Sequence, residues 1–104
     1  MTTRLEDEFH RALENHVYAD FKSHSFPMFL MQAMRRHSGV FAAKQLLGIS
    51  PVRSGLTELG EQGRLDMSVE VLMLQERWRP LFSVDELKLA RERLKDLGYE
   101  PDRH

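Results

Sequence analysis

Apolar residues recur at helical spacing near both ends of the chain, each time directly after a capping-box sequence. Thr3-x-x-Glu6 opens the first of these segments, and Ser83-x-x-Glu86 opens the second. In a capping box the two side chains bond reciprocally to backbone N–H groups that have no partner inside the helix. The spacing therefore predicts helices over residues 4–20 and from about 84 to 97. Their apolar stripes are Leu5, Phe9, Leu13, Val17 and Phe21 in the first helix, and Val84, Leu87, Ala90, Leu94 and Leu97 in the second.

Glycine, serine and proline divide the middle of the chain into short segments. Serine favours the position before a helix, and glycine favours the position after one. The short stretch 49–53 is predicted to be a turn, and Gly98 to end the last helix in a left-handed conformation with Tyr99 packing back. The helices predicted on these signals cover residues 26–37, residues 40–47 after Ser38, and residues 55–62 after Ser54.

Residues 67–74 fit two kinds of secondary structure. Met67, Val69, Val71 and Met73 alternate with more polar residues, as in a half-buried strand. A helix over residues 69–79 is favoured, because the run continues through Trp78 and no second strand is evident to pair with it.

The segments together predict an all-α fold. At 104 residues and 12.2 kDa, the chain has the size of one domain with one modest core. We expect a compact single domain over residues 1–104, built from five or six mostly short helices. Residues 1–3 and 100–104 are expected to be frayed termini.

Composition and charge narrow the function classes. The chain has fifteen Lys and Arg residues and sixteen Asp and Glu residues, which give a net charge of −1 and a pI near 6.5. This balance disfavours a dedicated nucleic-acid binder, which usually has a pI above about 9. The chain has no cysteine, its first residues are acidic, and its longest apolar run, residues 26–31, contains Pro27. We therefore expect a soluble cytoplasmic protein with no membrane span.

No group of residues has the spacing of a catalytic or metal site. The five histidines are never four residues apart, as helical zinc ligands would be, and no Gly-x-Ser-x-Gly sequence is present. We expect no enzyme activity, no metal and no cofactor. Two basic groups, Arg35-Arg36-His37 and Arg91/Arg93/Lys95, could contact phosphates, but both suit the C-terminal end of a helix equally well.

The segment Phe26–Met34 is apolar on almost every side of a short helix. Such a helix is either the buried centre of a core or part of a surface shared with a partner. Methionine and phenylalanine make an adaptable apolar surface, which favours association, including a homodimer. The candidate partner-binding residues are Tyr18, Phe21, Phe26, Met28, Phe29, Leu30, Met31 and Met34.

The second half of the chain resembles a group of small bacterial helical proteins. The resemblance rests on Gly39-Val40-Phe41-Ala42-Ala43-Lys44-Gln45-Leu46-Leu47, on Ser54-Gly55-Leu56-Thr57-Glu58-Leu59, on residues 63–74, on Trp78-Arg79-Pro80-Leu81-Phe82, and on Glu86–Leu94. It spans about residues 38–99, and its shared residues suit caps, turns and core. With its N-terminal third included, the chain is similar to the QslA-like family of quorum-sensing anti-activators.

That resemblance implies a small helical protein that binds a LuxR-type transcription activator. Such a protein would occupy the surface that the activator needs for dimerisation, and the activator could then no longer hold DNA. The resemblance assigns no individual residue to the contact. Two alternatives remain open: a small nucleic-acid-binding accessory protein, and an adaptor subunit of a larger bacterial assembly.

Overall fold

The computed structural model describes residues 3–20 and 28–101. Within these ranges the chain is all-α: seven α-helices and two short 3-10 helices, with no strand. The helices are α1 (Arg4–Asp20), α2 (Met28–Arg36), α3 (Gly39–Leu47), α4 (Pro51–Ser54), α5 (Leu56–Glu61), η1 (Leu65–Met67), α6 (Val69–Leu74), η2 (Glu76–Leu81) and α7 (Val84–Asp96).

Both predicted capping boxes are present. Before α7, the Glu86 N–H donates to Ser83 Oγ at 3.1 Å, and the Ser83 N–H donates to Glu86 Oε1 at 2.8 Å. Before α1, Thr3 and Glu6 make the same reciprocal pair at 3.1 and 3.4 Å. Because these bonds satisfy backbone donors within four residues of chain, the sequence alone places the starts of both helices.

The C-terminal end of α7 also follows the sequence pattern. Gly98 has a φ of +83°, and its N–H donates to the carbonyl of Lys95 at 2.9 Å. The Tyr99 N–H donates to the carbonyl of Leu94 at 3.0 Å. These two bonds make a Schellman motif, with Tyr99 packed against the core as predicted.

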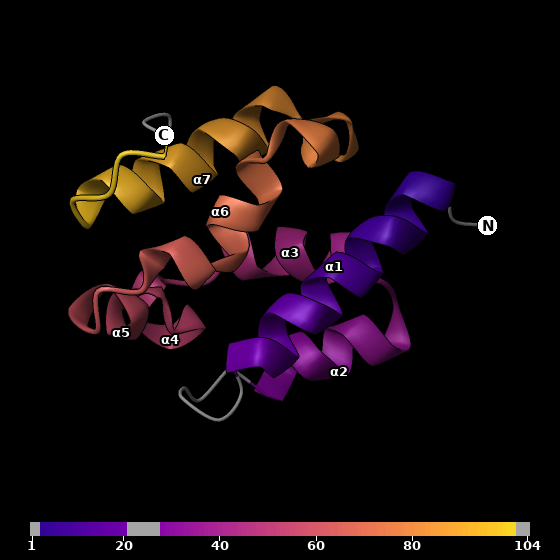
Figure 1. The fold of residues 1–104 in the computed structure, drawn as a ribbon, viewed down its shortest axis with the longest axis horizontal. Coiled ribbons are helices and arrows are strands. Elements are labelled where there is room, and N and C mark those ends of the chain that lie inside the picture. The colour runs from indigo at the N-terminus through magenta and orange to yellow at the C-terminus, as the bar shows by residue number, and fades with distance from the viewer. Residues whose placement is uncertain (1–2, 21–27, 102–104) are drawn as a thin grey trace.

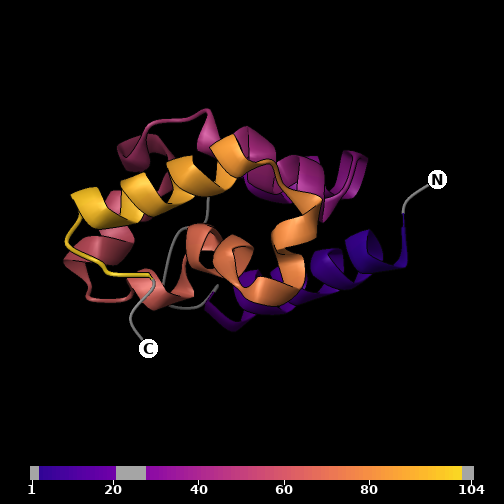
Figure 2. The same ribbon diagram turned by 90° about the horizontal axis from the view of Figure 1, so that it is seen from above.

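Helix α3 is the central element of the fold. It contacts α1, α2, α6 and α7, so most of its surface is covered. Figure 1 shows α1 and α2 on one side of it, with α6 leading up to α7 at the far side. Seen from above, α7 and α1 lie at opposite edges of the molecule (Figure 2). The buried residues of α3 are Gly39, Val40, Ala42, Ala43, Leu46 and Leu47.

Gly39 allows α1 and α3 to cross at close range. A Cβ atom at this position would lie 2.8 Å from the Cα of His10, which is closer than real Cβ contacts. The obstacle is backbone, so a side chain at this position could be accommodated only by moving a helix. The glycine is therefore required by packing, although its φ is not in the left-handed region.

Aromatic rings join α1 to η2. Phe9 is fully buried, and its ring meets those of Trp78 and Phe82 edge to face, with centroids 5.5 and 5.3 Å apart. Glu8, one residue earlier, forms an ion pair with Arg77. The hydrogen bond from Arg77 lowers the pKa of Glu8 below its usual 4.5. The N-terminal helix is thus held to the second half of the chain by both apolar and charged contacts.

The helix predicted over residues 69–79 is divided in two. The segment is helical, not a strand, but α6 ends at Leu74 and Gln75 is extended, with φ −62° and ψ 136°. The 3-10 helix η2 then continues to Leu81 and contains Pro80. Proline has no N–H to donate and clashes with the carbonyl four residues earlier, so an α-helix cannot run through it.

Two further predictions in the middle of the chain were wrong in detail. Residues 51–54 form helix α4, where a turn was predicted. Ser54 does not cap the next helix: Gly55 takes the N-cap position of α5 with a φ of +87°, and Ser54 turns its side chain into the core. These extra short elements raise the helix count within the described ranges above the five or six expected.

Candidate interaction surface

The structure places two of the predicted partner-binding residues in the core, which corrects the sequence prediction. Leu30 is fully buried and Met34 is 7% exposed. They lie four residues apart on one face of α2, and α2 packs against α3. Gln32, Arg35 and Arg36 are exposed on the other faces. Among the described side chains of α2, the buried stripe is therefore apolar and the exposed positions are polar.

The structure describes the other six predicted residues to different extents. Met31 is half-buried on α2. Tyr18 belongs to α1, and Met28 and Phe29 belong to α2, but their side chains lie outside the described part. Phe21 and Phe26 lie outside the described residues altogether.

Phe41 on α3 is an exposed aromatic side chain that the sequence analysis did not select. It is 39% exposed, and its ring lies against the ring of His37 with the centroids 4.2 Å apart and the ring planes tilted by 43°. Its backbone N–H donates to Ser38 Oγ at 3.1 Å, the N-cap bond of α3. The polar stripe of α3 was the signal for this position: Phe41 shares it with Lys44, Gln45 and Gly48, which are all exposed.

An ion pair between α3 and α7 lies beside Phe41. Lys44, three residues after Phe41, has its Nζ 3.6 Å from Glu86 Oε1 on α7. Leu89, three residues after Glu86, is also 39% exposed. We call Phe41, Lys44, Glu86 and Leu89 the α3–α7 surface. It combines two apolar side chains with a charged pair, as the contact surfaces of transient complexes commonly do.

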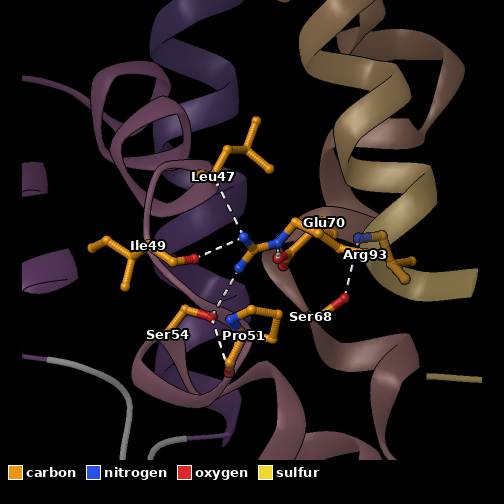
Figure 3. Close-up of polar contacts among 8 residues, drawn as sticks. Leu47, Ile49, Pro51, Ser54, Ser68, Glu70 and Arg93 are labelled. Atoms are coloured by element: carbon orange, nitrogen blue, oxygen red, sulfur yellow. Dashed lines mark hydrogen bonds and ion pairs between the residues drawn. The ribbon is translucent and has the colours of Figure 1, made fainter. Parts of the chain in front are cut away.

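A buried polar network lies at the inner side of the same two helices (Figure 3). Arg93 of α7 donates from Nε to Glu70 Oε2 at 2.9 Å. One terminal nitrogen donates to the carbonyls of Leu47 and Ile49 at 3.2 and 2.7 Å, and the other donates to Ser54 Oγ at 3.1 Å. The guanidinium thereby satisfies carbonyls at the end of α3 and fixes α4 against α7.

Arg93 is consequently not available to a phosphate. Its side chain is 7% exposed, and four acceptors already occupy the guanidinium. The sequence pattern that paired it with Arg91 and Lys95 did not distinguish a surface arginine from a buried one. Glu70 was the available signal, because a carboxylate within the apolar run Val69–Leu74 needs a buried partner.

Burial has the largest effect on the pKa of Glu70. Its side chain is almost fully buried, and desolvation raises the pKa of the carboxyl above its usual 4.5. The charge of Arg93 acts in the opposite direction without cancelling that effect. Ser54 Oγ completes the network by donating to the carbonyl of Pro51 at 3.3 Å. The network therefore has a structural role: it bonds α6 and α7 to the chain between α3 and α4 and holds that connection in place.

Neither a cluster of metal ligands nor a membrane-spanning helix occurs in the described residues. No three His, Asp or Glu side chains there gather closely enough to hold a metal ion. His10 instead lies 3.3 Å from Glu14 on the surface of α1. Among the described helices, none is both long and apolar enough to cross a membrane.

Protein-family models, curated proteins and solved structures were compared with the chain, and none matched it significantly.

Proposed function

We propose that this chain is a non-catalytic interaction protein that binds a LuxR-type transcription activator in the bacterial cytoplasm. By occupying the dimerisation surface of the activator, it would prevent the activator from holding DNA. The overall length and the N-terminal third, which are similar to those of the QslA-like family, support this proposal. Inhibition of this kind needs no catalytic group, only a surface that competes by mass action with the activator's self-association.

The exposed ring of Phe41 is the observation that carries the proposal. Large aromatic side chains supply much of the binding energy of protein interfaces. The His37 ring at 4.2 Å restricts the motion of Phe41, so less conformational entropy is lost when a partner covers it. Lys44, three residues after Phe41, pairs with Glu86, so a partner that covers this surface would meet two charges that neutralise each other.

A second part of the proposed contact surface lies at α1 and α2. Tyr18, Phe21, Phe26, Met28, Phe29 and Met31 keep this role in the proposal, whereas the buried Leu30 and Met34 do not. We also propose that the free protein is a homodimer through these residues, because closely spaced methionine and aromatic side chains in the sequence are typical of adaptable apolar association surfaces.

The test uses the purified protein, a purified ligand-bound LuxR-type activator and labelled operator DNA. Adding the protein should release the activator from DNA and produce a smaller, mixed complex in size-exclusion chromatography. Unchanged operator binding at saturating protein would contradict the proposal. Retention of DNA by the protein alone would favour the nucleic-acid alternative instead.

Phe41→Ser and Leu89→Ser should weaken the mixed complex, each by about 1–2 kcal/mol, or about 5- to 30-fold in Kd. Val84→Ser is the matched control. Val84 is 82% exposed on α7 but lies two residues from Glu86, about 200° around the helix, and so faces away from the α3–α7 surface. If Val84→Ser weakens the complex as much as Phe41→Ser, the contact lies elsewhere.

A further inference from the structure

A cavity of about 140 Å³ lies between the turns that end α5 and α7. Figure 2 shows the turn after α7 beside the segment that joins α5 to η1. Both turns are Schellman motifs built on a glycine of positive φ, +69° at Gly63 and +83° at Gly98. The lining residues are Gly63, Leu65, Asp66, Gly98 and Tyr99.

The electrostatic setting of this cavity favours a cation. The C-terminal ends of two helices meet here; the Schellman bonds satisfy their last carbonyls, and the aligned backbone dipoles leave a weak partial negative charge at each end. Asp66 adds a full negative charge from an exposed position in the lining. Over residues 61–66 and 95–100 together, four acidic residues outnumber two basic ones.

The Tyr99 ring in the cavity lining favours an arginine side chain over a lysine side chain as the bound cation. Tyr99 is half-buried and packs against the core, so the ring is held in place. Arginine stacks on aromatic faces more readily than lysine and loses less hydration in doing so. A carboxylate beside the ring can accept two parallel bonds from a guanidinium but not from an ammonium group.

We propose that this cavity is a binding site for an arginine side chain of a partner protein, with Tyr99 stacking on the guanidinium and Asp66 accepting its hydrogen bonds. The volume of about 140 Å³ is close to that of a cavity that accepts a benzene ring, and a guanidinium with two methylene groups has the same number of heavy atoms as benzene. The site is separate from the α3–α7 surface and does not depend on the activator as partner.

The site can be tested on the free protein with N-acetyl-arginine methylamide as the probe, followed by amide NMR. The Gly63 and Gly98 resonances should shift and saturate with this probe. The citrulline analogue has nearly the same shape without the charge and should shift them at least about tenfold more weakly. Equal responses to the two probes, or no response at either glycine, would overturn the proposal.

Variants then separate the two contacts. Asp66→Asn should weaken probe binding by about tenfold, and because Asp66 is exposed the fold should be unaffected. Tyr99→Phe keeps the ring and its packing, and should retain binding within about twofold. Binding that survives Asp66→Asn unchanged would overturn the assigned role of the carboxylate. A lysine probe that binds as well as the arginine probe would overturn the specificity for arginine.

Discussion

At the scale of single residues, Arg93 joins three parts of the chain that are distant in sequence. Its guanidinium reaches Glu70, two carbonyls at the end of α3, and the hydroxyl of Ser54. Burying a charge is costly unless the charge is paired and every donor is bonded. The planar, forked guanidinium meets this condition because its donors point in several fixed directions.

Arg93→Lys should therefore be strongly destabilising, although it keeps the charge. A single ammonium nitrogen cannot reach all four acceptors, and each buried acceptor left unpaired costs about 1–3 kcal/mol. We expect a loss of about 2–4 kcal/mol in the free energy of unfolding by urea denaturation. The control is Arg36→Lys, an exposed change of the same chemistry, which should stay within about 0.5 kcal/mol. Equal effects of the two changes would show that the network contributes little.

The raised pKa of Glu70 makes its contribution to stability depend on pH. Just above the usual carboxyl pKa of 4.5, the folded state holds the proton on Glu70 more tightly than the unfolded state does. Stability linked to Glu70 is therefore fully present below that value and is lost as pH rises through the folded pKa. The unfolding free energy of the wild type minus that of Glu70→Gln should fall over this range. A difference that rises with pH would mean that Arg93 outweighs desolvation.

At the scale of elements, local capping determines where helices begin. Ser83 and Glu86 bond reciprocally to each other's backbone N–H groups before α7. Ser83→Ala should cost about 1 kcal/mol in unfolding free energy, whereas Ser83→Gly should cost only a few tenths. Chemical denaturation of the two variants side by side measures the difference. Equal effects would contradict the role of the hydroxyl in starting this helix.

Close packing predicts different responses to substitution at Gly39, the first residue of α3, and at Gly48, the residue after it. Gly39→Ala places a Cβ 2.8 Å from the Cα of His10, so α1 and α3 must separate, and we expect a loss of about 1–3 kcal/mol. Gly48→Ala is the matched control. Gly48 follows α3 with a φ of −84°, and an added Cβ would meet the carbonyl of Gln45 at an ordinary 3.5 Å. Thermal melting should show a large drop in Tm for the first variant only.

At the scale of the whole molecule, the proposed association surfaces lie on a small core centred on α3. For the proposed homodimer, light scattering at micromolar concentration should give twice the chain mass of 12.2 kDa. Phe29→Arg should abolish the dimer while the helical circular dichroism and a cooperative melt persist. A wild type that is monomeric throughout this range contradicts the dimer. Unfolding of Phe29→Arg would instead assign Phe29 to the core, through the cost of a buried unpaired charge.

Short-range signals along the chain suffice to predict the helical fold class and the ends of several helices. Caps at Thr3, Ser38 and Ser83 and the glycine after α7 act through bonds that span three to five residues. The choice of helix over strand at residues 69–74 also followed from the length of the run and the lack of a partner strand. Such signals need no knowledge of distant neighbours, because every atom involved lies in the same short stretch of chain.

Which side chains are buried and which remain exposed depends instead on contacts between distant segments of the chain. Leu30 is in the core because α2 packs against α3, whereas Phe41 is exposed because it lies on a face of α3 that the neighbouring helices do not cover. Arg93 can be buried because α6 brings Glu70, 23 residues earlier in the chain, within hydrogen-bond distance. A helix carries its own apolar pattern, but the number of neighbours that cover each face depends on how distant segments pack, and no local spacing contains that information.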